Sequence, residues 1–336
     1  MRSLVLEDTR RLAWHEVPEP KRRREREAIV RPLAVAMCDL DQPMIFGETP
    51  FAMPVHLGHE CVAEVVEGPE GCPPGDRVVV PFQISCGFCE RCRRGLTGSC
   101  ATVAPLSMYG FGALGGDWGG MLSDLALVPY AEAMLVPLPD GVEPTTVASA
   151  ADNIADGWRA VAPALAEHPA APVLVVGGRV RSISLYAIDV ALALGASSVT
   201  YVDPDAGRCA VAQELGATVV VQGEPERSLG AFPVTVDGTG TPEGLVATLR
   251  LTDWGGRCTS LGQLAPSGSL PLFELYTRGV HLHIGRAMAR PAIPAILDLV
   301  GAGRLRPHVV TSATVAWDDA PEALLEPAIK LVVHRA

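Results

Sequence analysis

Four cysteines lie close together in the segment CGFCERCRRGLTGSC, which spans residues 86–100 and has the spacing C-x2-C-x2-C-x7-C. Thiolates are soft ligands that suit zinc, and four of them leave no open coordination position. We therefore predict a structural zinc that stiffens this loop and takes no part in catalysis. Its ligands would be Cys86, Cys89, Cys92 and Cys100. An iron–sulfur cluster or free thiols are the alternatives.

A second pattern predicts a phosphate-binding turn. The segment VLVVGGRVRSIS joins an apolar, strand-like run to a helix through Gly177 and Gly178. Backbone N–H groups at the start of a helix attract anions, so this turn is typical of a dinucleotide site. Only two glycines of the pattern G-x-G-x-x-G are present, and the turn is about two residues longer. An α/β domain that binds no dinucleotide is the alternative.

An acidic residue after the next predicted strand supports the dinucleotide interpretation. The run VTYVD ends at Asp203, 26 residues after Gly177. A carboxylate there accepts a hydrogen bond from a ribose 2′-hydroxyl and repels a 2′-phosphate, which favours NAD(H) over NADP(H). The predicted cofactor contacts are Gly177, Gly178, Arg179, Arg181, Ser182, Ile183, Asp203 and Arg208. For the two arginines of the turn, exposure to solvent is the alternative to a pyrophosphate contact.

Two kinds of segment must position these residues. The first 145 residues contain short apolar runs broken by Gly and Pro, such as ECVAEVVEG and DRVVVPF, which predicts an irregular β-rich domain. From there the pattern changes: residues 145–168 predict a helix, and strands then alternate with helices to about residue 290. This alternation indicates a doubly wound parallel sheet. The chain closes with a further helix from about residue 290 and the segment EALLEPAIKLVV.

Composition excludes several classes of function. The 336 residues suffice for two domains, and the net charge of −11 argues against nucleic acid as a partner. The basic run KRRRER at 21–26 is expected to be a solvated loop. No apolar segment predicts secretion or a membrane span, so a cytoplasmic protein with a small-molecule substrate is expected. Beyond the zinc loop and Cys38, the remaining cysteines are expected as strand, loop or core thiols: Cys61, Cys72, Cys209 and Cys258.

Several motifs in one order carry a family resemblance. Cys38 ends a strand-like run, GHE follows at 58–60, GDRVVVP at 75–81, and then come the four-cysteine loop and the late nucleotide-binding pattern. Over nearly its whole length the chain resembles the zinc-dependent medium-chain alcohol dehydrogenases. The resemblance implies a β-rich GroES-like catalytic domain at 1–148 and 291–336. It also implies a Rossmann NAD-binding domain, with its doubly wound sheet, at 149–290.

The resemblance further implies a catalytic zinc with three protein ligands and one open position. Cys38 and His59 match two of the ligands. Counting back from the segment GWRAV puts Asp152 in the place of the third. Asp156 is an alternative ligand one helical turn later, and capping a helix is an alternative role for Asp152. Glu60 is similar to the family's mobile carboxylate, which approaches the metal when water leaves.

The chain departs from the family at its proton relay. Leu40 and Pro43 stand where many relatives carry hydroxyl or imidazole groups, and neither side chain transfers a proton. Asp39, Glu60 or a chain of waters is expected to replace that relay. The residues expected at the substrate pocket from their family positions are Leu40, Phe46, Met108, Trp118, Asn153 and Arg286.

The implied reaction is hydride transfer between NAD(H) and a secondary alcohol or polyol, or the matching ketone or aldehyde. Zinc would act as a Lewis acid on the substrate oxygen. A reductase of an imine or activated alkene is one alternative, and a nucleotide sensor without catalysis is another. We expect two zinc ions per chain. The strand at 279–285 resembles the family's edge strand at a two-fold axis, which predicts a homodimer or homotetramer.

Overall fold

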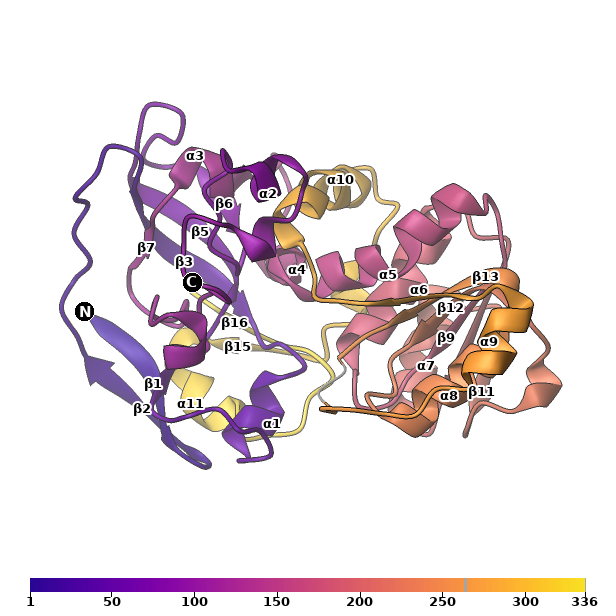
Figure 1. The fold of residues 1–336 in the computed structure, drawn as a ribbon. Coiled ribbons are helices and arrows are strands. Elements are labelled where there is room, and N and C mark those ends of the chain that lie inside the picture. Colours follow the sequence, from indigo (N-terminus) through magenta and orange to yellow (C-terminus); the bar gives the residue numbers. More distant parts are fainter. Residues whose placement is uncertain (263–264, 336) are drawn as a thin grey trace. The chain divides into compact units, whose positions relative to one another are not determined.

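The computed structural model describes residues 1–262 and 265–335, which form two compact units (Figure 1). Unit 1 contains Met1–Ala155, Met288–Ala302 and the described residues from Thr311 onward, and unit 2 contains Asp156–Ala287 and Gly303–Val310. The boundaries expected after residues 148 and 290 differ from these, and residues 303–310 were assigned to the other domain. The expected boundaries were placed where the sequence pattern changes, whereas the compact units are defined by contacts within the structure.

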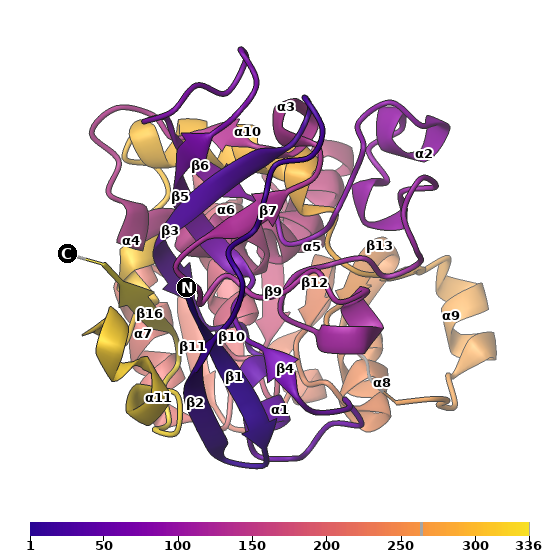
Figure 2. The ribbon, with the colours of Figure 1, turned by 90° about the vertical axis from the view of Figure 1, so that its left-hand side faces the viewer.

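Unit 1 is built on two sheets, in which only the pair of β15 and β16 is parallel. The smaller sheet has the order β2-β1-β4, and Figure 2 shows its two longer strands side by side. Its strands are β1 (Arg2–Asp8), β2 (Arg11–Glu16) and β4 (Val55–His56). The larger sheet has the order β15-β16-β3-β5-β6-β8, with β7 pairing β3. Its strands are β3 (Ala28–Ala36), β5 (Glu60–Glu67), β6 (Arg77–Val80), β7 (Ala126–Val128), β8 (Val136–Pro137), β15 (Ala313–Ala316) and β16 (Leu331–His334).

Apart from α10, the helices that lie wholly in unit 1 are short, because the chain between its strands is rich in glycine and proline. They are α1 (Asp41–Ile45), α2 (Glu90–Arg93), α3 (Ala131–Met134), α4 (Pro144–Val147), α10 (Ala289–Gly301) and α11 (Ala320–Ala323), with 3-10 turns η1 (Thr97–Ser99), η2 (Gly112–Gly115), η3 (Ala148–Ala151) and η6 (Trp317–Asp319). One apolar core joins the two sheets and includes Leu4 and Leu6 of β1 and Val30 and Val35 of β3, all buried.

Unit 2 is a six-stranded parallel sheet of order β11-β10-β9-β12-β13-β14. Its strands are β9 (Val173–Val176), β10 (Val199–Asp203), β11 (Val219–Gln222), β12 (Phe232–Asp237), β13 (Thr252–Ser260) and β14 (His281–Ile284). All residues of β9 and β10 are buried, as the apolar runs of a sheet covered on both faces require. The order is that of the doubly wound fold, so the predicted α/β class is confirmed.

Helices cover both faces of this sheet (Figure 1). They are α5 (Asn153–Glu167), which begins in unit 1, α6 (Ser182–Ala193), α7 (Ala206–Leu215), α8 (Pro242–Arg250) and α9 (Leu272–Arg278), with 3-10 turns η4 (Arg227–Leu229) and η5 (Pro307–Val309). Because parallel crossovers are right-handed, α6 and α7 fall on one face and α8 and α9 on the other. Within 1–262 and 265–335, no helix combines the length and apolarity needed to cross a membrane.

Candidate functional site

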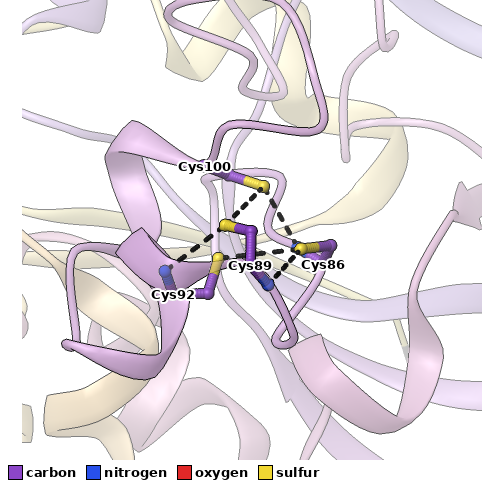
Figure 3. A group of neighbouring side chains, drawn as sticks. All are labelled: Cys86, Cys89, Cys92 and Cys100. Atoms are coloured by element: carbon purple, nitrogen blue, oxygen red, sulfur yellow. Dashed lines mark hydrogen bonds between the residues drawn. The ribbon is translucent and has the colours of Figure 1, made fainter.

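The four cysteines of the 86–100 loop converge on one point (Figure 3). Their sulfurs all lie within 4.8 Å of one another, and two pairs, Cys86–Cys92 and Cys89–Cys100, are 4.0 Å apart. A tetrahedral ion with zinc–sulfur bonds of about 2.3 Å requires sulfurs about 3.8 Å apart. The spacing of the sulfurs therefore fits one zinc ion.

Backbone N–H groups point at these sulfurs, as they do around metal-bound thiolates. The N–H groups of Cys89 and Cys92 donate to Cys86 Sγ at 3.3 Å and Cys89 Sγ at 3.5 Å, respectively. Hydrogen bonds from the backbone N–H groups of Ala101 and Cys92 lower the pKa of Cys89 to about 6. All nine cysteines are free thiols, and the four outside the two groups, Cys61, Cys72, Cys209 and Cys258, are buried. The geometry of the loop therefore favours binding a metal over forming disulfides.

A second group of ligand-type side chains is buried in unit 1: Cys38, His59, Glu60 and Asp152, with ligand atoms within 4.8 Å of one another. Cys38 Sγ lies 3.3 Å from Asp152 Oδ2, and His59 Nε2 lies 3.5 Å from the same oxygen. Strand pairing explains how they meet. The last residue of β3 pairs with Glu60 at the start of β5, so Cys38 and His59 flank adjacent strand ends.

Asp152 reaches this group because the helix predicted at 145–168 is broken. The chain forms α4 and η3, stops at Asp152 with φ −150° and ψ −76°, and resumes as α5 at Asn153. The prediction of one continuous helix was therefore wrong at the residue that carries the third ligand. A non-helical backbone here aims the carboxylate at Cys38 and His59 instead of along a helix surface.

Burial and neighbouring carboxylates shift the pKa values of the grouped side chains. Burial and then the negative charges of Asp152 and Glu60 raise the pKa of the Cys38 thiol well above its usual range. Burial lowers the pKa of His59, but the carboxylates of Asp41, Asp152 and Glu60 outweigh burial and raise that pKa to about 9. Burial raises the pKa of Glu60 to about 7, against the lowering effect of Lys330. A metal ion that replaced the protons would relieve this repulsion.

Unpartnered atoms support the same conclusion. Both ring nitrogens of His59 and Oδ1 of Asp41 are buried without a hydrogen-bond partner among the described residues. Buried polar atoms normally have partners, and a ligand-type nitrogen facing a thiol and a carboxylate is explained by a bound metal. The residues present therefore fit a zinc ion held by Cys38, His59 and Asp152, with the Glu60 carboxylate as a nearby fourth ligand-type group.

Two neighbours of the group were missed by sequence reasoning. Asp41 lies with Oδ1 3.7 Å from His59 Nδ1 and accepts a hydrogen bond from the Cys38 backbone N–H at 2.8 Å, so it can orient both ligands. Lys330, fully buried, lies with Nζ 2.6 Å from Glu60 Oε2 and donates to the Met37 carbonyl at 2.7 Å. An acid three residues after Cys38 was a usable signal for Asp41, whereas nothing in the sequence marked Lys330.

The other candidates of this region are not among the four grouped residues. Asp156, the alternative ligand, pairs with Arg159 at 2.6 Å and is not among the four grouped residues. Asp39 is buried next to Cys38, and Leu40 precedes α1 as its N-cap residue. Two aromatic rings that the sequence did not indicate flank His59: Phe111 at 4.8 Å and Phe82 at 5.8 Å between ring centroids.

The predicted pocket residues belong to both units. Asn153 lies beside the ligand group, with Oδ1 3.2 Å from Cys38 Sγ. The Arg10 guanidinium lies over the Phe46 ring at 5.0 Å. Trp118 lines a surface groove together with the basic loop that follows Pro18. Met108 is buried and Arg286 is exposed on unit 2.

In unit 2 the predicted turn follows β9. A Cβ atom on Gly177 would lie 2.0 Å from Asp203 Oδ2, so only glycine fits there. Gly178 has φ +151°, and a Cβ on it would lie 2.8 Å from the backbone of Thr239. The other predicted contacts lie in the turn or at the start of α6: Arg179, Arg181, Ser182 and Ile183.

Asp203 ends β10 as expected, but its carboxylate is fully buried, and each of its oxygens already accepts two hydrogen bonds. Oδ1 accepts from the Asp205 backbone N–H at 2.8 Å and from Arg208 at 2.6 Å. Oδ2 accepts from the Tyr201 hydroxyl at 2.6 Å and from Arg208 Nε at 2.8 Å. A ribose hydroxyl would have to replace one of these partners. Arg208 was predicted as a cofactor contact, and the structure shows it as the hydrogen-bond partner of Asp203.

Comparison with known proteins identifies the family of the chain. The family models "Alcohol dehydrogenase GroES-like domain" and "Zinc-binding dehydrogenase" match residues 24–140 and 182–302. The chain is 29% identical to the probable zinc-binding alcohol dehydrogenase Rv1895 of Mycobacterium tuberculosis, over 95% of this chain and 83% of that protein. It is 29% identical to geraniol dehydrogenase of Castellaniella defragrans, over 83% of this chain and 82% of that enzyme.

Among solved structures, the alcohol dehydrogenase TADH from Thermus sp. ATN1 has a TM-score of 0.89 and 29% identity, and the match covers 100% of both chains. The first match lies within unit 1, and the second covers strands β10 to β14 of unit 2 and α10 of unit 1. The chain therefore belongs to the zinc-dependent alcohol dehydrogenases of the medium-chain dehydrogenase/reductase superfamily.

Proposed function

We propose that this oxidoreductase transfers a hydride between NAD(H) and a secondary alcohol or polyol, or the matching ketone or aldehyde. The observation that carries the proposal is the buried group of Cys38, His59 and Asp152, whose ligand atoms lie within 4.8 Å of one another. The names of the relatives, alcohol and geraniol dehydrogenases, support an alcohol as the substrate. A small-molecule substrate and a cytoplasmic location are part of this proposal.

The chain's own residues would divide the work as follows. Cys38, His59 and Asp152 would hold a zinc ion, which when bound supplies Lewis acidity toward the substrate oxygen. Phe111 and Phe82 pack around His59 and exclude water from that side of the group. Lys330 fixes the carboxylate of Glu60 at 2.6 Å. Because Leu40 cannot carry a proton, we propose Asp39 or Glu60 for that role.

A substrate screen tests this proposal. The zinc-loaded protein is assayed with secondary alcohols, polyols and ketones, using NAD(H) and NADP(H) in parallel, and Cys38→Ser serves as the control. Turnover that requires Cys38 supports the proposal. Equal turnover by wild type and Cys38→Ser, or turnover only with imines or activated alkenes, would contradict it.

The preference for NAD(H) is proposed from the pairing of Asp203. Its bidentate contact with Arg208 keeps that guanidinium occupied, so the guanidinium is not available to a 2′-phosphate. An oxygen of Asp203 can replace one of its hydrogen-bond donors by a neutral ribose hydroxyl. A 2′-phosphate at the same place would be repelled, because it and the carboxylate are both negatively charged.

Replacing Asp203 by glycine is expected to shift cofactor preference toward NADP. The change removes a carboxylate and releases Arg208, and a charge-assisted contact to a phosphate is worth about 1.5–3 kcal/mol, so the kcat/KM ratio should move by about tenfold or more. Asp205→Ser, which keeps a capping side chain at the start of α7, is the matched control. An unchanged ratio in a folded Asp203→Gly protein would rule out this role for the pair.

We also propose that the chain forms a homodimer, or a homotetramer, through the edge of the unit 2 sheet. β14 ends the strand order, and apolar side chains near it are exposed: Leu272, Phe273 and Tyr276 of α9, and Ile284. Uncovered strand edges and apolar patches of this kind are typical of interfaces. Light scattering at micromolar concentration is expected to give a dimeric or tetrameric mass, and Ile284→Lys a smaller one. A monomeric wild type would refute the proposal.

A further inference from the structure

A surface groove in unit 1 contains the basic run that the proposed function leaves unexplained. Its volume is about 600 Å³, which lies within the range of sites that hold small molecules. Three cations line it, Lys21, Arg23 and Arg24, all from the segment between β2 and β3. Trp118 and Tyr130 add aromatic rings to the lining. We call this site the basic groove.

The three cations of the basic groove have no anionic partner in the chain. Lys21, Arg23 and Arg24 are exposed, and within residues 1–262 and 265–335 no ion pair joins them to a carboxylate. By contrast, Arg11 and Arg31 pair with glutamates at 2.7 and 3.3 Å. In a chain with a net charge of −11, unpaired cations gathered at one groove create a local positive potential that attracts anions.

Two carboxylates also line the basic groove, and neither is paired with its cations. Glu27 is buried, and its Oε2 accepts hydrogen bonds from the backbone N–H groups of Arg23 at 2.6 Å and Arg24 at 2.9 Å. These bonds fix the turn of the basic run and do not involve the guanidinium groups. Glu19 is exposed, so solvent and salt screen its charge. The lining therefore keeps three positive charges against two negative ones.

A tight loop holds the indole of Trp118 in the basic groove. Gly116, Asp117 and Gly119 have φ of +83°, +54° and +79°, and the Asp117 backbone N–H donates to the Gly112 carbonyl at 3.0 Å. A Cβ atom on Gly116 would lie 3.2 Å from Trp118 Nε1, so the backbone passes close to the ring. Trp118 is only half-buried, and the remainder of its ring is a surface on which a flat ligand can stack.

We propose that the basic groove binds a mononucleotide-type anion, which is a flat aromatic ring that carries a phosphate. The ring packs against Trp118, and the phosphate contacts Arg23 and Arg24. A phosphate carries a charge of about −1.5 to −2 at neutral pH and forms bidentate hydrogen bonds with guanidinium groups, so it suits three cations better than a single carboxylate does.

The basic groove shares almost no residues with the sites described above. Its lining contains no member of either ligand group and none of the predicted cofactor contacts. Trp118 was expected at the substrate pocket, but none of the other residues expected there lines the basic groove. The proposed ligand is therefore additional to the alcohol substrate and to NAD(H).

Flavin mononucleotide is a direct probe of the basic groove, because stacking against an indole quenches the fluorescence of its ring. Titration with the wild-type protein is expected to quench that fluorescence saturably. Riboflavin, which has the same ring without the phosphate, should bind about tenfold more weakly, because it lacks the charge-assisted hydrogen bonds. AMP should displace the flavin. Failure of AMP to do so would restrict the ligand to larger rings and would still support the site.

Two variants test the two parts of the lining separately. Arg23→Gln combined with Arg24→Gln removes two charges and keeps the backbone hydrogen bonds to Glu27. Trp118→Leu removes the stacking surface. Each variant should raise the Kd for flavin mononucleotide by about tenfold, as expected for a lost phosphate contact or a lost stacking partner. Circular dichroism checks that both variants are folded.

Matched controls remove the same groups outside the basic groove. Arg77→Gln combined with Arg227→Gln takes two charges from exposed positions, and Trp254→Leu removes an exposed indole of β13. Both controls should leave the Kd for flavin mononucleotide unchanged, because none of these residues lines the groove.

Three results would overturn the inference. The first is the absence of saturable quenching with the wild-type protein, and the second is riboflavin binding as tightly as flavin mononucleotide. The third is binding that survives both groove variants but is lost when Arg179→Gln is combined with Arg181→Gln, because the flavin would then occupy the glycine turn of unit 2. None of these results depends on the zinc sites, so they test the groove independently of the proposed function.

Discussion

Asp152→Ala is expected to remove one zinc ion per chain and to lower kcat/KM by about a thousandfold. The carboxylate is the third ligand by position, 3.3 Å from Cys38 Sγ and 3.5 Å from His59 Nε2. Losing a ligand empties or distorts the site, and Lewis-acid stabilisation of several kcal/mol is worth about this factor in rate. Elemental analysis and steady-state kinetics on the same preparation measure both effects.

Asp156→Ala is the matched control for that substitution. Asp156 is the same residue type four positions later, but it pairs with Arg159 at 2.6 Å and is not among the grouped ligands. The variant should keep its zinc content and most of its activity. The reverse pattern, with Asp156→Ala losing the ion and Asp152→Ala keeping it, would show that the ligand is assigned to the wrong aspartate.

Cys92→Ser is expected to lose the other zinc ion and to destabilise unit 1 by several kcal/mol. Structural zinc sites contribute folding free energy outright, with apparent binding free energies of about 10–16 kcal/mol in small zinc-finger peptides. The loop also holds α10, because the backbone N–H of Gly98 donates to Met288 Sδ at 3.2 Å and η1 contacts the helix. Urea unfolding followed by circular dichroism should show an earlier transition.

Cys72→Ala controls for the loss of a buried thiol as such. Cys72 is buried in the same apolar core but lies outside both ligand groups. Replacing it should leave the zinc content unchanged. The free energy of unfolding should fall only by the cost of the small cavity that the replacement creates. If Cys92→Ser unfolded at the same urea concentration as Cys72→Ala and kept its zinc, the loop would not be a structural metal site.

The sequence predicted the identity of the grouped ligands better than the backbone that presents them. Cys38, His59 and Asp152 were assigned from the family resemblance, and the structure brings their side chains together. The break in the helix at Asp152 was not predicted, because the alanine-rich run around it favours helix throughout. Tertiary contacts with the ligand group override that local preference at one residue.

Partners that come from distant parts of the chain were the hardest to predict. Lys330 pairs with Glu60 across 270 positions of sequence, and a lone lysine near the C-terminus looks like a surface residue until β16 is placed beside β3. Arg208 is a local case. It follows Asp203 by five residues, on the first turn of α7, and only the geometry shows that its guanidinium occupies both carboxylate oxygens.

The number of zinc ions per chain tests the central claim most directly. Elemental mass spectrometry on gently purified protein should give two, one in the four-cysteine loop and one held by Cys38, His59 and Asp152. A single ion per chain, retained in Cys38→Ser, would contradict the account, because the buried group would then be a metal-free cluster and the proposed alcohol chemistry would lose its basis.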